Sequence, residues 1–566
     1  MPAGPQRDIL RRRIDAALGR RDCDLVIDNA RWLDVFSARF REGPVAIDAG
    51  VIVGLEPGRR GRRVIDARGR ALVPGFIDAH VHVESSMMLP EAFATAVLPH
   101  GTTSAVCDPH ELANVVGTRG IQYFLDAATR LPLDLWVMLS SCVPATALET
   151  NGGGSIDAEA LASLASHPRA LGLAELMSFP ALLAGDDGVL AKLEAFTTSR
   201  VDGHAPAVRG EKLSAYAAAG VSSCHESSQL DEAAEKLMKG MAVWIREGSV
   251  AKDARALAPL LSLATSTSAG FCTDDRNPYD IAHEGHVDHV VRVALAAGVQ
   301  PEVAYRAASW SVARHYGLDR GARRVGAVAP GFAADLVLLD DVRTCALAGV
   351  IKGGVPVAEL APATPVDAHD LEGTVKAAVP EASALEGPRG RVHVIQVEHG
   401  KLLTGRRVDA HDGPGVRRLS VLERHGHGER PANGYVAGFG ELRGAIASSV
   451  GHDSHNLIVV GEQTYDMRVA LAELCRLGGG FAVVQGGEVR ASLALPYGGL
   501  MSAATPAELA RGIAGLKTAS RAIGCVLPEP FLQLAFLSLP VIPSLKLTNK
   551  GLVDVDRFEL VSVVAA

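Results

Sequence analysis

Residues 74–88, "PGFIDAHVHVESSMM", hold the pattern that decides how the rest of the chain is interpreted. An apolar run ends in two histidines, His80 and His82, which lie one residue apart and alternate with valines. In a β-strand, residues i and i+2 project from the same face, so both imidazoles point the same way. The stretch therefore predicts a buried strand that ends in two side chains able to bind one ion.

Seven further β-rich runs follow this strand, separated by helical segments such as "AEALASLASHP" and "LDEAAEKLMKG". The runs occupy residues 102–108, 133–143, 170–178, 200–205, 221–226, 241–249 and 268–275. Eight strands that alternate with helices over about 200 residues are typical of a (β/α)8 TIM-type barrel. Short apolar runs also fit parallel strands that are buried on both faces.

Both flanks of the predicted barrel carry a different pattern. Residues 24–72 alternate β-branched runs with turn residues, and residues 324–341 repeat that pattern. We expect the two flanks to pair as one small antiparallel sheet. After the second flank, strands and helices mix again, which predicts an α+β unit. The expected α/β architecture has four segments: 1–72 and 323–375 form the small β domain, 73–322 the barrel, and 376–566 the C-terminal α+β domain.

The composition is that of a globular protein that does not bind nucleic acid. The 566 residues are 48% hydrophobic and 21% charged, with a formal net charge of -8 and no Lys/Arg block. The most apolar late segment, residues 530–545, is broken by prolines and is too short to span a bilayer. The eight cysteines are scattered without a CxxC motif, which favours a reducing cytoplasm over a disulfide scaffold. We therefore expect a cytoplasmic protein with a small neutral ligand and no membrane segment.

Ionisable residues gather at the ends of the predicted strands, where barrel enzymes place their catalytic groups. Six of them converge on one mouth, from five of the eight strands: His80, His82, Glu175, His204, His225 and Asp274. Nitrogen and oxygen ligands without thiolate suit Mn, Fe(II) or Zn, and a carboxylate can bridge two ions. Water made acidic by such ions is a nucleophile near neutral pH. A lone HxH is more often incidental and a lone Glu is often a capping residue, but the joint occurrence favours a metal centre.

Sequence motifs around these residues indicate which family of metal-dependent enzymes the chain resembles. "HVESS" (82–86), "DPHE" (108–111), "DGHAP" (202–206), "CHES" (224–227), "TDDR" (273–276) and "SSVGHDSHN" (448–456) together resemble the bacterial adenine deaminases, a family of the amidohydrolase superfamily. The resemblance runs from residue 24 nearly to the end. It implies hydrolytic deamination of adenine to hypoxanthine and ammonia.

The resemblance also implies two divalent metal ions, with Mn or Fe(II) favoured and Zn possible. One ion would be held by His80, His82, Glu175 and Asp274, and the other by Glu175, His204 and His225. Relatives such as dihydroorotases use a carbamylated Lys as the bridge, but the fourth strand, "GLAELMS", offers Glu175 and no Lys. "HVE" matches half of the zinc cytidine-type deaminase signature, but no P-C-x-x-C follows, which argues against that fold.

Deamination needs proton transfers as well as a nucleophile. Asp274, at the mouth, is the expected group that takes a proton from water and returns one to the leaving nitrogen. Glu84 continues the alternating register of the two histidines, so we expect it to face the purine ring and protonate it. Its alternative role is that of a loop carboxylate or a partner of a ligand histidine.

Further residues are expected to bind the substrate. Asp108, His110 and Glu111 end the second strand and open on the mouth, either as substrate contacts or within an ordinary Pro-containing turn. Ser85 is able to hydrogen-bond purine nitrogens or to cap the next helix. His452 and His455 lie in a polar loop that either closes over the mouth, from the same or a neighbouring subunit, or orders its own domain.

Other functions stay open from the residues alone. Another binuclear amidohydrolase, acting on a cyclic amide or a different aminopurine, would use the same chemistry. A catalytically silent metal-binding scaffold is the alternative outside enzymes, although such proteins usually lack one of the ligand groups. The expected partner is a small purine base, and we expect a homo-oligomer, a dimer or a tetramer.

Overall fold

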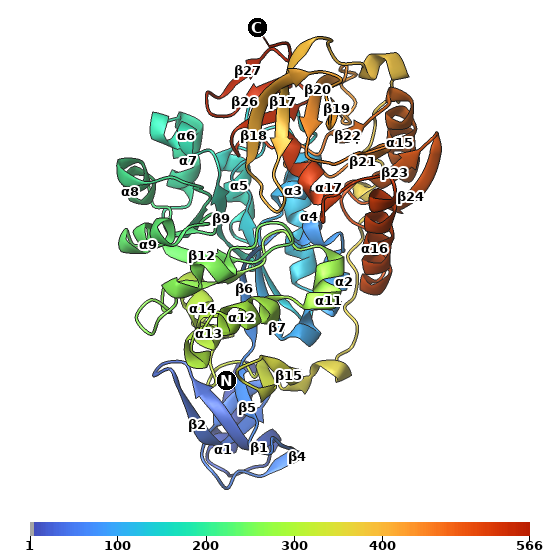
Figure 1. Ribbon diagram of the computed structural model, residues 1–566. Coiled ribbons are helices and arrows are strands. Elements are labelled where there is room, and N and C mark those ends of the chain that lie inside the picture. The colour runs from blue at the N-terminus through green and yellow to red at the C-terminus, as the bar shows by residue number, and fades with distance from the viewer. Residues whose placement is uncertain (1–4, 566) are drawn as a thin grey trace.

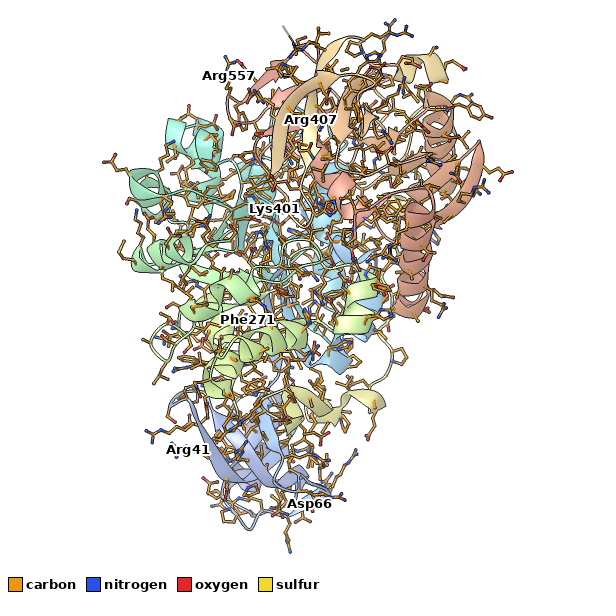
Figure 2. All side chains as sticks on the ribbon, in the orientation of Figure 1. Arg41, Asp66, Phe271, Lys401, Arg407 and Arg557 are labelled. Carbon is orange, nitrogen blue, oxygen red and sulfur yellow. The ribbon has the colours of Figure 1, made fainter. Side chains whose placement is uncertain are left out.

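The computed structural model describes residues 5–565, which form three parts along one long axis (Figure 1). A small sheet with the N-terminus lies at one end, strands and helices fill the middle, and the orange and red C-terminal part lies at the other end. Side chains fill the space between these elements (Figure 2), and Phe271, labelled in the middle part, is fully buried. Among these residues no helix is both long and apolar enough to cross a membrane.

The small sheet combines the two flanks of the middle part, as the sequence predicts. Its order is β16-β15-β14-β5-β1-β2-β3, with β4 paired to β1. The first helix, α1 (Pro5–Ala17), precedes it. The strands are β1 (Cys23–Asp34), β2 (Arg39–Asp48), β3 (Val51–Gly54), β4 (Gly61–Asp66), β5 (Ala71–Pro74), β14 (Leu336–Asp341), β15 (Ala346–Lys352) and β16 (Val355–Pro356).

The prediction of a purely antiparallel sheet is wrong. The long strand β1 has a register irregularity between Ile27 and Ala30, and it pairs parallel to β4 before that point and parallel to β5 after it. Alternating hydrophobicity predicts where the strands lie but not whether neighbouring strands run parallel or antiparallel. Either direction buries the same face of a strand. The bulge lets one strand serve two parallel partners.

Eight short parallel strands make up the middle part, and each lies within one of the eight predicted runs. They form two sheets with the orders β10-β9-β8-β7-β6 and β11-β12-β13, and every pairing in both is parallel. The strands are β6 (Phe76–Val81), β7 (Thr102–Cys107), β8 (Asp134–Leu139), β9 (Ala170–Leu176), β10 (Arg200–Gly203), β11 (Ser223–Cys224), β12 (Ala242–Arg246) and β13 (Ala269–Cys272).

Backbone contacts join the two parallel sheets at both edges. Ser222, just before β11, donates its N–H to the carbonyl of Val201 on β10 at 2.9 Å. At the other edge, Val81 of β6 and Asp274 form a parallel bridge, and the Asp274 N–H donates to the His80 carbonyl at 3.0 Å. The strand ends that carry the predicted ligands are therefore brought together by the backbone itself.

Helices follow each of these strands along the chain. They are α2 (Pro90–Val97), α3 (His110–Val116), α4 (Thr118–Ala128), α5 (Ala158–Leu164), α6 (Phe179–Ala184), α7 (Asp187–Ala195), α8 (Gly210–Ala218), α9 (Leu230–Met238), α10 (Ala254–Leu257), α11 (Pro278–Glu284), α12 (Val287–Ala296), α13 (Pro301–Ala307) and α14 (Trp310–Tyr316). Amphipathic helices such as α4 bury one face, which packs against the parallel strands.

The C-terminal part contains a sheet of order β18-β17-β20-β19-β22-β21-β23-β24 and a three-stranded antiparallel sheet. The larger sheet is built from β17 (Arg391–Val397), β18 (Thr404–Ala410), β19 (Val416–Leu422), β20 (Ala432–Ala437), β21 (Ala445–Ser448), β22 (Leu457–Gly461), β23 (Gly480–Gln485) and β24 (Glu488–Ala494). The smaller sheet and the helices are β25 (Leu545–Thr548), β26 (Gly551–Asp554), β27 (Glu559–Val561), α15 (Thr464–Leu477), α16 (Pro506–Ala522) and α17 (Pro530–Ala535).

The C-terminal part packs directly on the middle part. One apolar cluster includes Met88 and Leu112 from the middle part together with Leu500 and Met501 from the C-terminal part. The Ser502 N–H donates to the carbonyl of Met87 at 2.9 Å, close to the predicted ligand pair. The exact domain boundaries stay a prediction.

A buried ion cluster fixes the small sheet to the parallel strands. Lys352, at the end of β15, donates from Nζ to Asp134 Oδ2 of β8 at 2.7 Å and to Asp335 Oδ2 at 2.9 Å. It also donates to the Thr103 carbonyl of β7 at 2.8 Å, and both carboxylates are buried. The lysine therefore neutralises one carboxylate at the start of the parallel strand β8 and another that directly precedes β14 of the small sheet.

Replacing Lys352 with Met is expected to lower the free energy of unfolding by about 3 kcal/mol, because two buried carboxylates lose one of the two cations that contact both of them and keep Arg323. Urea unfolding measures the change. Arg63→Gln is the matched control, since Arg63 pairs with Glu359 while both side chains are half exposed, and it should change the free energy of unfolding much less than the loss of Lys352. Equal losses in the two variants would contradict a structural role for the buried cluster.

Candidate metal centre and active site

The HxH pair lies where the sequence predicts it. His80 is in β6 and His82 directly follows that strand with an extended backbone, φ −95° and ψ 102°. Their Nε2 atoms are 3.1 Å apart, and both side chains are almost fully buried. The strand alternation therefore places both imidazole nitrogens at one point in the interior.

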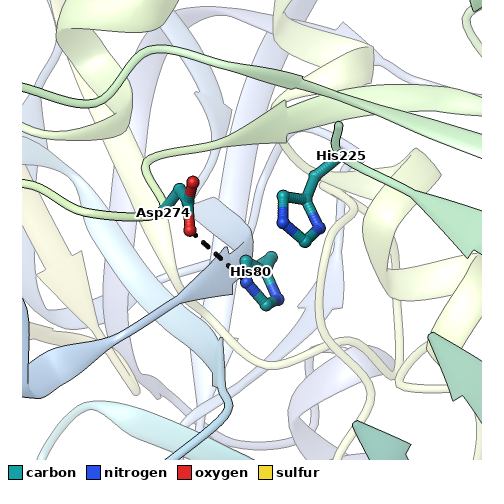
Figure 3. Close-up of side chains that lie close together, drawn as sticks. All are labelled: His80, His225 and Asp274. Carbon is teal, nitrogen blue, oxygen red and sulfur yellow. Dashed lines mark ion pairs between the residues drawn. The ribbon is translucent and has the colours of Figure 1, made fainter. Parts of the chain in front are cut away.

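Two carboxylates from distant strands meet this pair. Asp274 Oδ1 lies 3.5 Å from His80 Nε2 and 3.2 Å from His82 Nε2, and Figure 3 shows Asp274 facing His80. Glu175 Oε1 lies 3.6 Å and 3.4 Å from the same two nitrogens. Four ligand atoms from β6, β9 and the end of β13 thus surround one position.

Glu175 also belongs to a second group of ligand atoms. Its Oε2 is 2.6 Å from His204 Nδ1 and 3.5 Å from His225 Nε2. The His225 ring stacks on His80, with centroids 4.0 Å apart (Figure 3). One carboxylate therefore faces a histidine pair with each of its two oxygens.

This buried donor set fits divalent cations. Groups of three ligand atoms lie within 4.8 Å of one another, including His80, His82 and Glu175 in one group and Glu175, His204 and His225 in another. The atoms are imidazole nitrogens and carboxylate oxygens, which suit Mn, Fe(II) and Zn. Burial raises the pKa of the Glu175 carboxyl, but the charges of His204 and His225 hold it well below its usual range. A buried anionic carboxylate needs positive charge within the same small volume.

Backbone and side-chain contacts orient these ligands. The Ser141 hydroxyl donates to the Glu175 carbonyl at 2.6 Å, and the His204 N–H donates to the Tyr216 hydroxyl at 3.0 Å. His82 Nδ1 lies 3.0 Å from the carbonyl oxygen of Asp108, so Nδ1 carries the hydrogen and Nε2 is free to bind a cation.

Arg246 controls the outer oxygen of Asp274. Its Nη1 donates to Asp274 Oδ2 at 2.9 Å and also contacts the carboxylate of Glu226. Burial opposes ionisation of Asp274, but its contacts with His80 and His82 and the charge of Arg246 hold its pKa well below the usual range. One oxygen of Asp274 therefore faces the histidines while the arginine holds the other.

Glu84 does not continue the strand register, so that prediction is wrong. A 3-10 turn begins at Val83 directly after His82, and the alternation ends there. Glu84 Oε1 accepts the Leu112 N–H at 3.1 Å, whereas Oε2 has no hydrogen-bond partner among the described residues. Burial raises the pKa of this carboxyl to about 7. Glu84 and Ser85 line a second pocket beside the one that the metal-type ligands line.

The "DPHE" block supports the site from the end of β7. His110 Nδ1 lies 2.9 Å from Asp108 Oδ2 and 3.4 Å from Glu175 Oε1. The Ser140 hydroxyl donates to Asp108 Oδ1 at 2.7 Å. The Glu111 carboxylate lies 3.4 Å from His110 Nε2 and also contacts two histidines of the C-terminal part, His452 and His455. The block thus joins the central ligands to the C-terminal part.

The loop between β21 and β22 closes over this mouth within the same chain. The pocket that contains the ligand-type side chains is completed by residues of the C-terminal part: Leu402, His452, Asp453, Phe536, Leu539 and Ile542. Of the two interpretations of "SSVGHDSHN", the structure supports closure over the mouth.

Comparisons with known proteins agree with this arrangement. Residues 71–358 match the model of the amidohydrolase family, and residues 395–559 match the adenine deaminase C-terminal domain. A protein named adenine deaminase from Methylobacterium sp. (strain 4-46) is 52% identical over 98% of this chain and 99% of its own. Another of that name, from Cereibacter sphaeroides (strain ATCC 17025 / ATH 2.4.3), is 49% identical over 97% and 98%. The chain belongs to the adenine deaminase family of amidohydrolases.

A solved structure described as an adenosine deaminase from Xanthomonas campestris with bound zinc covers 61% of this chain and 95% of its own. Its sequence identity is 16% and its TM-score is 0.42.

Several residues at the site of this adenine deaminase family member are not predicted from the sequence. Strand alternation would point Glu226 away from its neighbour His225, but β11 ends at Cys224 and the Glu226 carboxylate faces the pocket beside Arg246. The doublet in "TDDR" is a usable signal for Asp275, whose carboxylate accepts the Ser85 hydroxyl. Arg246 lies at the end of the seventh strand, where an arginine had no predicted role.

Proposed function

We propose that this chain is an adenine deaminase that hydrolyses adenine to hypoxanthine and ammonia. The observation that carries the proposal is Glu175, whose two oxygens face the His80–His82 pair and the His204–His225 pair. The strand β9 offers this glutamate and no lysine, and it lies within the residues that match the amidohydrolase family model. The name of its relatives supplies the substrate class, a small purine base.

The architecture that we propose for this activity is a closed (β/α)8 barrel, residues 73–322. It is flanked by a small β domain, residues 1–72 and 323–375, and followed by an α+β domain, residues 376–566. The backbone contacts at both edges of the two parallel sheets support closure. Homo-oligomer formation and a cytoplasmic location stay predictions; all eight cysteines are free, which fits a reducing compartment.

Two divalent cations, Mn or Fe(II) in preference to Zn, are the cofactors that we propose. His80, His82, Glu175 and Asp274 would hold one, and Glu175, His204 and His225 the other, as the two groups of ligand atoms suggest. When bound, such cations lower the pKa of water toward neutrality and so supply a nucleophile for C6 of the base.

The side chains of the protein move the protons. Asp274 accepts a proton from the attacking water and returns it to the departing amine, while Arg246 holds its second oxygen in place. Glu84, with a raised pKa and an unpartnered Oε2, is a carboxylic acid suited to protonate N1. The second proton of the water, left on the C6 oxygen, restores Glu84 once the amine has departed. Ser85, Asp108, His110 and Glu111 are proposed to bind or orient the base.

Ammonia release from a panel of substrates tests the proposed reaction. The protein loaded with Mn²⁺ should deaminate adenine with kcat/KM at least about 100-fold above that for other aminopurines, and it should not open cyclic amides. Turnover of a cyclic amide without activity on adenine would overturn the proposal. Absence of turnover on the whole panel, with metal bound, would identify a silent metal-binding protein.

Glu84→Gln keeps the size of the side chain but removes its acidic proton. We expect kcat for adenine to fall by about 10²- to 10⁴-fold, the usual contribution of general acid–base catalysis, with unchanged metal content. Glu149→Gln is the matched control, because burial also raises the pKa of that carboxyl, to about 8, yet Glu149 lines neither pocket. A Glu84 variant as active as the control would rule out the acid role.

A further inference from the structure

His452 stands at the wall between the two pockets of the site. It comes from the loop between β21 and β22 of the C-terminal part, and it is 3% exposed. One of the two pockets holds the metal-type ligands and the other is bounded by Glu84, and the His452 side chain lines both. Any base that contacts both the ligand groups and Glu84 therefore passes this imidazole.

Three neighbours fix the orientation of the imidazole. Its Nδ1 contacts Glu111 Oε1, and its ring stacks on Phe536 with centroids 4.5 Å apart and planes inclined by 12°. Glu111 Oε2 contacts Nε2 of His455, whose Nδ1 accepts the Gly451 N–H at 3.3 Å. Because Nδ1 of His455 is an acceptor, its Nε2 carries the hydrogen and faces Glu111. The Glu111 carboxylate thus lies between the two imidazoles and faces Nδ1 of His452.

The other nitrogen of the ring is left without a partner. Nε2 of His452 is buried and makes no hydrogen bond in the described part of the chain. Burial disfavours a charged imidazole, but the negative charge of Glu111 outweighs it and raises the pKa of His452 to about 9. Both ring nitrogens then carry hydrogens, so Nε2 is a donor. A buried donor without an acceptor is costly, which points to a ligand that supplies one.

The surroundings of Nε2 suit a flat heteroaromatic ring. Phe536, Leu539 and Ile542 provide apolar surface in the pocket of the metal-type ligands, and Phe481 and Phe531 provide it in the adjoining pocket. Adenine offers ring nitrogens that are acceptors on the edges away from N1. A cationic imidazole donor among apolar side chains recognises such a nitrogen.

We propose that the Nε2–H of His452 donates a hydrogen bond to N3 or N7 of the purine ring, which makes His452 a specificity residue supplied by the C-terminal part. Glu111 acts through His452 as a positioning residue. This inference rests on the proposed adenine deaminase function. It also gives the C-terminal loop a direct part in substrate recognition rather than only in covering the mouth.

Three variants of the metal-loaded protein separate recognition from structure. His452→Phe keeps a flat ring against Phe536 and removes the donor, whereas His452→Gln keeps an N–H donor. His455→Gln is the matched control, because His455 also contacts Glu111 but lines neither pocket. The kcat/KM of each variant is measured by ammonia release from adenine, 3-deazaadenine and 7-deazaadenine, all of which retain N1 and the 6-amino group.

We expect His452→Phe to lower kcat/KM for adenine by about 10- to 100-fold, the range of a hydrogen bond with a charged donor. One of the two deaza bases lacks the acceptor nitrogen, and for that base the same substitution should change kcat/KM by less than about threefold. The variant and the wild type are compared on the same base, so differences in reactivity between the bases cancel. His452→Gln should recover most of the loss, and His455→Gln should keep the wild-type pattern across the three bases.

Equal losses on all three bases in His452→Phe would overturn the inference and leave a structural role for the ring. An unchanged kcat/KM for adenine in that variant would overturn it as well. Failure of the wild-type protein to deaminate adenine is a different result, because it removes the proposed function itself. Metal content and melting temperature of each variant show whether a loss reflects an altered fold or metal centre.

Discussion

The site depends on one buried carboxylate, Glu175, that is shared between two sets of histidines. An isolated anion in a protein interior is costly, so its charge must be balanced within the same small volume. The parallel strands solve this geometrically, because their carboxyl ends meet at one mouth and deliver His80, His82, His204 and His225 to the two oxygens. The strand order, the bridge between Val81 and Asp274 and the position of the C-terminal part all serve this arrangement.

The C-terminal part completes the site in a different way. The histidines that face Glu175 all come from the middle part, whereas the loop between β21 and β22 of the C-terminal part brings His452 and Asp453 to the pocket. Glu111 is the link, since it follows β7 in the middle part and contacts both His452 and His455. The loop that covers the mouth would therefore also orient the hydrogen-bond donor that we propose for the base.

Local patterns predict much of this from the sequence. The eight runs each contain a strand because apolar continuity and helical spacing are properties of neighbouring residues, and the HxH spacing fixes a common face through strand alternation. The prediction for Glu84 is wrong because a 3-10 turn at Val83 ends the alternation, which no periodicity signals. Local patterns also fail to predict the parallel partners of β1, which depend on a bulge within that strand. They fail for the orientation of Glu226 as well, because it depends on where the two-residue strand β11 ends.

Contacts between distant segments lie beyond local patterns. Nothing near Glu111 in the sequence indicates that it meets His452 and His455, and Arg246 gains its role only when β12 lies beside the end of β13. The resemblance to a family supplied the expectation of two ions, and the structure supplies the reason, a carboxylate with a histidine pair at each oxygen.

The most direct test of this account is a titration of metal-free protein with Mn²⁺ while adenine deamination is followed. The account predicts that activity rises to a plateau at two equivalents of metal per chain, and that Glu175→Ala binds neither ion tightly. A plateau at one equivalent, with Glu175→Ala retaining that ion and its activity, would contradict the shared carboxylate at the centre of the site.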